Sequence, residues 1–125
     1  MIANESEKNQ IRAGLLLNDG LYCARYFFKR RFDLKMIISA HHKVIQESLD
    51  RVRNGEISRL IINVPPGYTK TELATINLIV HSLAENPMAK FMHLSFGDSL
   101  ALENSSVARE SIESEEFQAM FPLKL

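Results

Sequence analysis

The chain is poor in cysteine, tryptophan and glycine. Its 125 residues include one cysteine, Cys23, no tryptophan and five glycines. A single cysteine excludes an intrachain disulfide and leaves a zinc site without its usual thiolate ligands. The sequence therefore predicts a protein of a reducing, cytoplasmic compartment.

Long hydrophobic runs and an excess of one charge are also missing. No apolar run approaches the roughly 18 residues that suggest a membrane helix, and the polar start with Glu5 and Glu7 is unlike a signal peptide. Fifteen basic residues balance fifteen acidic ones, so the net charge does not indicate a polyanionic partner. We expect one folded domain with no membrane association.

Helical patterns dominate the first 55 residues. The sequence predicts helices over about 6–17, 21–31 and 41–53, with Gly55 as the C-terminal cap of the third. Further helices are predicted over 70–85, 99–111 and 115–121, because apolar residues recur there at helical spacing or a proline ends the segment.

Two short apolar segments, 60–64 and 90–95, predict buried β-strands, each followed by a helix. Strand, helix, strand, helix is the order of a parallel sheet with right-handed crossovers. The predicted fold class is therefore α/β, with a helical lead-in over about 1–55 packed on a βαβα core over about 58–125.

The loop after the first predicted strand carries the candidate chemistry. A strand-to-helix loop offers N–H donors and the positive end of a helix dipole to a phosphate group. Lys70, with its ammonium turned into the loop, would neutralise β- and γ-phosphate oxygens, and the Thr71 hydroxyl would ligate Mg²⁺. The predicted nucleotide-binding residues are Pro66, Gly67, Tyr68, Thr69, Lys70, Thr71 and Glu72, with Thr71 also the metal ligand and no catalytic residue assigned.

The loop departs from the phosphate-loop pattern G-x-x-x-x-G-K-[ST], because Val64 and Thr69 replace its two glycines. A positive φ is costly for a β-branched residue, so we expect the loop to avoid it at Thr69 or to bind phosphate less well. Taken alone, the segment fits both a phosphate cradle and a proline-bounded turn that merely starts a helix.

The sequence around the loop resembles that of phage terminase large subunits, the ATPase motors that package viral DNA. The similarity runs from about residue 26 to 125. Family members commonly have Pro-Pro before the loop and lack its first glycine, but Gly67 stands where arginine is frequent and Thr69 where glycine is frequent. The matching segments are Phe27 to His42, Arg59 to Pro66, Lys70 to Ala74, Asn86-Pro87, His93 to Ser95 and Leu100-Ala101.

The resemblance implies a partial P-loop NTPase domain, with ATP and Mg²⁺ as cofactors and an adenine pocket near Phe32, His41 and His42. In the full-length family the partners are viral double-stranded DNA, the portal protein and the small terminase subunit. The family's Asp-Glu hydrolysis motif and nuclease domain have no counterpart here. We therefore expect a truncated, ATP-binding chain without efficient turnover, in an infected or lysogenic host.

Two other readings remain open: a non-hydrolysing nucleotide-binding or assembly module, and an inactive prophage remnant. A sheet cut at an open edge would also predict marginal stability or self-association. Residues 26–32 interleave aromatic and basic residues, which could bind single-stranded nucleic acid. Their helical spacing favours an amphipathic element packed on the core.

Overall fold

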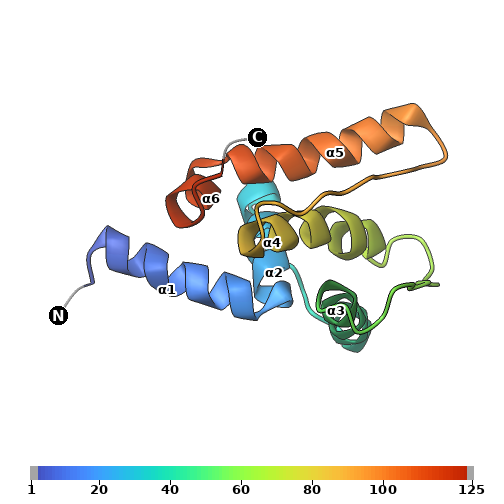
Figure 1. Ribbon diagram of the computed structural model, residues 1–125, viewed down its shortest axis with the longest axis horizontal. Helices are drawn as coiled ribbons and strands as arrows, with labels where there is room; N and C mark the ends of the chain where they lie inside the picture. The colour runs from blue at the N-terminus through green and yellow to red at the C-terminus, as the bar shows by residue number, and fades with distance from the viewer. Residues whose placement is uncertain (1–2, 124–125) are drawn as a thin grey trace.

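The computed structural model describes residues 3–123, and these residues form a bundle of helices (Figure 1). The π-helical segment η1 and α4 are continuous, and together they contact α1, α2, α3 and α5. In chain order the elements are α1 (Glu5–Asn18), α2 (Gly20–Phe32), α3 (Ala40–Arg53), η1 (Glu72–Asn77), α4 (Leu78–Glu85), α5 (Asp98–Glu113) and α6 (Glu115–Met120). Within residues 3–123, no helix is long and apolar enough to cross a membrane.

The predicted helices are confirmed, with ends that differ by one or two residues. Local capping explains where they begin and end. The Asn4 side chain accepts the Glu7 N–H and the Glu7 carboxylate accepts the Asn4 N–H, which starts α1. The Asp19 carboxylate caps α2, and Gly55 takes a φ of 77° just after α3.

The predicted α/β fold is wrong, because no β-strand occurs in residues 3–123. The predicted strands 60–64 and 90–95 are irregular segments whose backbones form no hydrogen bonds with other parts of the described backbone. A short apolar run is typical of a buried strand, but a strand exists only when a second strand pairs with it. The expected βαβα core and its P-loop NTPase sheet are therefore not observed.

Apolar side chains from all the helices form two adjoining core clusters. The first joins α1, α2, α4, α5 and α6 around Leu16, Phe27, Val80, Ile112 and Phe117. The second joins α2, α3 and η1, and Leu60, Ile62 and Val64 pack against it from the irregular segment. Ile61 is exposed and the other three apolar residues are half-buried, so the burial expected for a strand at 60–64 is not observed either.

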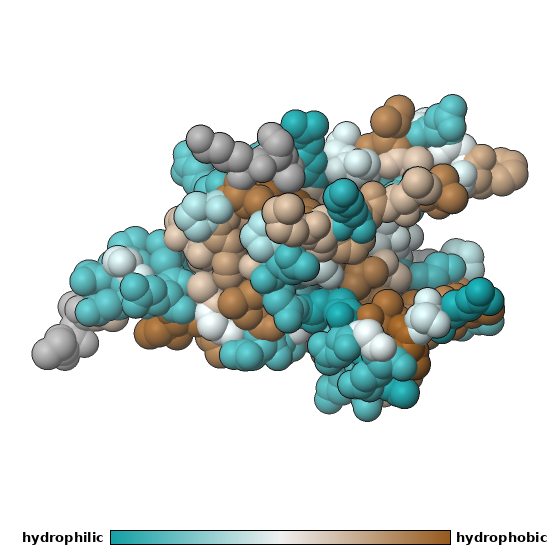
Figure 2. Space-filling view, viewed as in Figure 1, coloured by the Kyte–Doolittle hydropathy of each residue, from teal (hydrophilic) through white to brown (hydrophobic). Residues whose placement is uncertain are grey.

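The two irregular segments leave apolar side chains on the surface. Ile61, Met92 and Leu94 are 82–85% exposed, and Phe96 is fully exposed. Figure 2 shows hydrophobic surface at the end of the molecule where these segments lie. The bundle thus buries its helices well but leaves its longest connections poorly covered.

Candidate functional site at residues 65–72

The loop before η1 contains two residues with positive φ. Gly67 has a φ of 86° and Thr69 a φ of 57°. Of the two alternatives expected for Thr69, a loop that avoids a positive φ is therefore wrong, and weaker phosphate binding stays a prediction. A positive φ costs on the order of 1–3 kcal/mol for a non-glycine residue and must be offset by contacts. The Thr69 hydroxyl supplies two of them, by donating to the Tyr68 carbonyl at 2.7 Å and lying 2.6 Å from His42 Nε2.

Backbone N–H groups of the loop are available to a ligand. Within the described residues, the N–H groups of residues 67–72 donate no hydrogen bond to any protein acceptor. The first backbone bond of the following helix runs from the Leu73 N–H to the Thr69 carbonyl, at 3.2 Å. Unpaired N–H groups at the start of a helix are the usual donors to a bound anion.

Lys70 and Thr71 lie on the surface at the end of the loop, where the helix begins. Lys70 forms no ion pair with a carboxylate in the part of the chain that the structure describes. Its ammonium is therefore not committed to the protein. The exposed side chain would have to fold back over the loop to reach a phosphate bound at the amides.

Glu72 is held by the protein instead of facing the loop. Its carboxylate forms an ion pair with Arg31 of α2, and the two side chains are only 13% and 10% exposed. Solvent screens such a pair much less than a surface pair. The contact fixes the start of η1 against α2, so Glu72 acts as an anchor of the loop.

His42 anchors the loop from the other side. It is buried, and its Nδ1 accepts the Ser39 N–H at 2.8 Å. The neutral ring therefore carries its proton on Nε2, which donates to the Thr69 hydroxyl. Burial, aided by the neighbouring His41, lowers the pKa of His42 below its ordinary value and favours this neutral form.

The residues expected near an adenine pocket separate into two groups. The centroid of the His41 ring lies 3.9 Å from that of the His42 ring and 5.3 Å from that of the Tyr68 ring. His41 and Tyr68 meet edge-on. Both histidines thus border the loop. Phe32 instead packs against Phe28, with ring centroids 4.9 Å apart, and is 53% exposed.

Sequence reasoning missed the contacts that hold the loop. Thr69 and His42 are 27 residues apart, and Arg31 and Glu72 are farther apart still, so no local spacing indicates either contact. The π-helical turn of η1 was also unexpected, although such turns are frequent at functional sites. The order proline, glycine, lysine and threonine before a helix did predict a loop at this place, and its role as a binding site stays a prediction.

No metal centre accompanies the loop. In residues 3–123, no group of three or more His, Cys, Asp or Glu side chains could hold a metal ion. Thr71 offers one hydroxyl oxygen, whereas Mg²⁺ requires six oxygen ligands. A metal ion at Thr71 would have to arrive with phosphate oxygens and water.

Comparisons of the chain with protein-family models, with curated proteins and with solved structures find no match. The functional argument therefore rests on the loop, its anchors and the residues that resemble terminases. The resemblance to terminases implied a parallel sheet that residues 3–123 do not form, so it supports the sequence pattern of the loop and not a P-loop NTPase fold.

Proposed function

We propose that residues 66–71, anchored by Glu72, bind the phosphate groups of ATP with Mg²⁺, in the nucleotide-binding portion of a phage terminase large subunit. Backbone N–H groups of the loop and the Lys70 ammonium contact phosphate oxygens, and Thr71 contacts the metal. The chain binds nucleotide without efficient turnover. In this proposal viral double-stranded DNA, the portal protein and the small terminase subunit are partners of the complete motor.

One observation carries the proposal: the N–H groups of residues 67–72 have no protein acceptor, although the loop is fixed at both sides. Preorganised donors at a helix start bind an anion without the entropy cost of ordering the backbone. The exposed, unpaired Lys70 adds the positive charge that a polyphosphate requires.

The position of the histidines supports a nucleotide over a simple phosphate. His41 and Tyr68 lie edge to face beside the loop, with ring centroids 5.3 Å apart. Aromatic rings at this place give a flat base a surface to pack on. The resemblance to terminases in the same segment points to adenine.

Thermal unfolding with and without millimolar Mg-ATP tests nucleotide binding. A ligand that binds only the folded state raises stability by about 2.7 kcal/mol at a concentration of 100 times its Kd. We expect the melting temperature to rise for the native chain and not for Lys70→Ala. Lys90→Ala is the matched control, because Lys90 is an exposed lysine outside the loop and should keep the full rise.

The outcomes separate the alternatives. A flat melting temperature for the native chain at all Mg-ATP concentrations would reject nucleotide binding and favour an inactive remnant. A rise that survives in Lys70→Ala would reject the assigned loop. Phosphate release above background, lost in Lys70→Ala, would instead show an active ATPase and reject the lack of turnover.

A further inference from the structure

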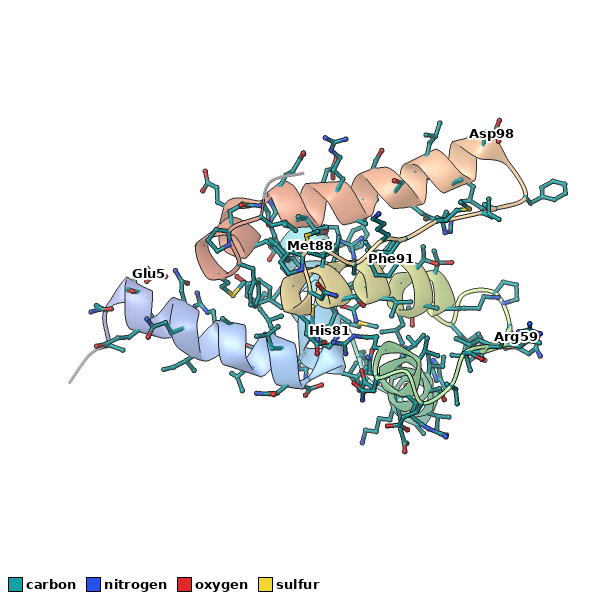
Figure 3. All side chains as sticks on the ribbon, in the orientation of Figure 1. Glu5, Arg59, His81, Met88, Phe91 and Asp98 are labelled. Carbon is teal, nitrogen blue, oxygen red and sulfur yellow. The ribbon has the colours of Figure 1, made fainter. Side chains whose placement is uncertain are left out.

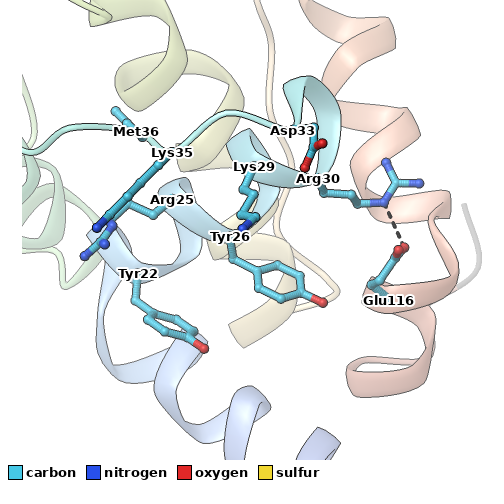
Figure 4. A pocket seen from close by; sticks show the side chains of 9 residues that line it. All are labelled: Tyr22, Arg25, Tyr26, Lys29, Arg30, Asp33, Lys35, Met36 and Glu116. Atoms are coloured by element: carbon cyan, nitrogen blue, oxygen red, sulfur yellow. Dashed lines mark hydrogen bonds and ion pairs between the residues drawn. The ribbon is translucent and has the colours of Figure 1, made fainter.

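A second candidate site lies on the surface along α2, beside its contact with α6. An open groove of about 770 Å³ runs along α2 and the segment that follows it, with Glu116 of α6 at one side (Figure 4). Its volume falls in the range of ligand-binding sites. It shares no residue with the loop at 65–72, so it is independent of the proposed ATP site.

The groove gathers positive charge in a chain whose total charge is zero. Its four cationic side chains are Arg25, Lys29, Arg30 and Lys35. Arg30 is neutralised by Glu116, since Arg30 Nε lies 2.8 Å from Glu116 Oε2. The other three are exposed and form no ion pair with described residues. The second carboxylate of the groove, Asp33, forms no ion pair with described residues, so four cations and two carboxylates leave a net positive charge of two for an anionic ligand.

Two tyrosines line the same groove. Tyr22 and Tyr26 are one helical turn apart, so both side chains face the groove from α2 (Figure 4). Tyr26 is held by an edge-on contact with the buried Phe27 ring, at a centroid distance of 5.1 Å. Both tyrosines also pack against the first core cluster. The rings are thus rigid and half-buried, with a surface left for a ligand.

We propose that this groove binds single-stranded nucleic acid, with phosphates at Arg25, Lys29 and Lys35 and bases stacked on Tyr22 and Tyr26. Cations that follow a backbone and aromatic rings that receive bases are the two components of single-strand sites. A duplex keeps its bases stacked inside and cannot use the tyrosines. An acidic peptide could use the cations but gains little from the rings.

The fold also explains which residues of the basic, aromatic segment take part. Phe27 is in the core, and Arg31 is paired with Glu72. The site is therefore not the run of residues 26–32 read from the sequence. It is the exposed face of α2, completed by Lys35 from the following segment.

Fluorescence anisotropy with a labelled dT12 strand tests this site, with a 12-base-pair duplex and a polyglutamate peptide as competing probes. We expect dT12 to bind more tightly than either. The triple variant Arg25→Gln, Lys29→Gln, Lys35→Gln should weaken dT12 binding tenfold or more. The slope of log K against log salt is negative, and loss of three phosphate contacts should make it less negative by about 2.

The matched control is Lys43→Gln, Arg59→Gln, Lys90→Gln, which removes the same charge at exposed positions outside the groove. It should keep dT12 affinity within twofold. The double variant Tyr22→Phe, Tyr26→Phe keeps the rings and should keep dT12 binding. The double variant Tyr22→Leu, Tyr26→Leu (the Leu pair) removes the rings and should lose it. Lys70→Ala should leave dT12 affinity unchanged, which separates this site from the ATP site.

Three results would overturn the proposal: equal affinity for the duplex or polyglutamate, equal losses in the groove and control triples, or no measurable binding of dT12 at low salt. Circular dichroism of each variant checks that it is folded. If the Leu pair unfolds, the Phe pair and the exposed charge triple still decide the outcome.

Discussion

At the scale of single residues, two buried histidines link stability to pH. His81 lies at the centre of the bundle (Figure 3), where its Nε2 donates to the Leu17 carbonyl at 3.1 Å. Its Nδ1 has no partner among the described residues. Burial, and then the nearby Arg53, lowers the pKa of His81 below its ordinary value. Burial likewise lowers the pKa of His42. Both rings are therefore neutral in the folded protein.

This arrangement predicts a loss of stability in mild acid. Above the unfolded pKa of about 6.5 both states hold neutral histidines, so the full stability is present. As the pH falls below that value, the unfolded chain binds protons first, and stability is lost towards the lower pKa of the folded state. Thermal melts between pH 8 and pH 5 should show a falling melting temperature.

A substitution identifies the source of that loss. His81→Gln can keep a donor to Leu17 without titrating, so its melting temperature should depend less on pH. His93→Gln is the control, because His93 lies on the irregular segment outside both core clusters. An unchanged pH dependence in His81→Gln would contradict the assignment.

Cys23 gives a second prediction at this scale. Its thiol is 1% exposed, and burial raises its pKa to about 12. Thiolate is the reactive form, so the native protein should react with a disulfide reagent at least about a hundredfold more slowly than the denatured chain. Absorbance of the released thiolate follows both rates. Similar rates would show that α2 opens readily.

At the scale of the helices, the helix positions could be predicted because helix signals are local, but the fold class could not. The Asn4 and Asp19 caps, Gly55 and the spacing of Ile45 and Leu49 all lie within a few residues of what they determine. The wrong prediction of strands at 60–64 and 90–95 has the opposite cause. Pairing between distant segments decides whether a strand forms, and no local pattern contains that information.

The candidate site, too, could be predicted from the sequence only in part. The local pattern of glycine and lysine before a helix predicted a loop at 65–72, which the structure contains. Its anchors could not be predicted, because the contacts of Thr69 with His42 and of Glu72 with Arg31 join distant parts of the chain. His41 and His42 border the loop and Phe32 does not, and an adenine pocket at the histidines stays a prediction.

Two glycines in helices make a prediction about packing. At Gly20, the first residue of α2, a Cβ atom would lie 2.2 Å from Gln46 Nε2. Gln46 is buried and donates to Asp50 Oδ1 at 2.9 Å, so it cannot move freely. Gly20→Ala should therefore destabilise the protein by about 1–3 kcal/mol, despite the helix propensity of alanine.

Gly14 in α1 is the matched control. A Cβ atom there meets nothing within 4 Å, so Gly14→Ala should stabilise the protein by up to about 1 kcal/mol. Urea unfolding measures both free energies. Equal effects of the two substitutions would show that the close approach between Gly20 and Gln46 does not determine stability.

At the scale of the whole molecule, the uncovered segments predict self-association. Met92 and Leu94 are 85% and 82% exposed, and the backbone around them forms no hydrogen bonds with other backbone segments of residues 3–123. An apolar chain with free backbone donors and acceptors can pair with the same segment of another molecule. Sedimentation velocity should therefore show association that increases with protein concentration.

A pair of variants separates backbone pairing from simple hydrophobic contact. Met92→Lys with Leu94→Lys adds charge repulsion on the segment and should shift sedimentation towards the monomer. Since both side chains are exposed, the free energy of unfolding should change by less than about 0.5 kcal/mol.

Ile11→Lys is the control. It also removes an apolar side chain that is 62% exposed, but this side chain lies on α1, where the backbone groups already form helical hydrogen bonds. If strand-like pairing drives association, Ile11→Lys leaves sedimentation unchanged. If Ile11→Lys shifts sedimentation towards the monomer as much as Met92→Lys with Leu94→Lys does, hydrophobic contact alone causes the association.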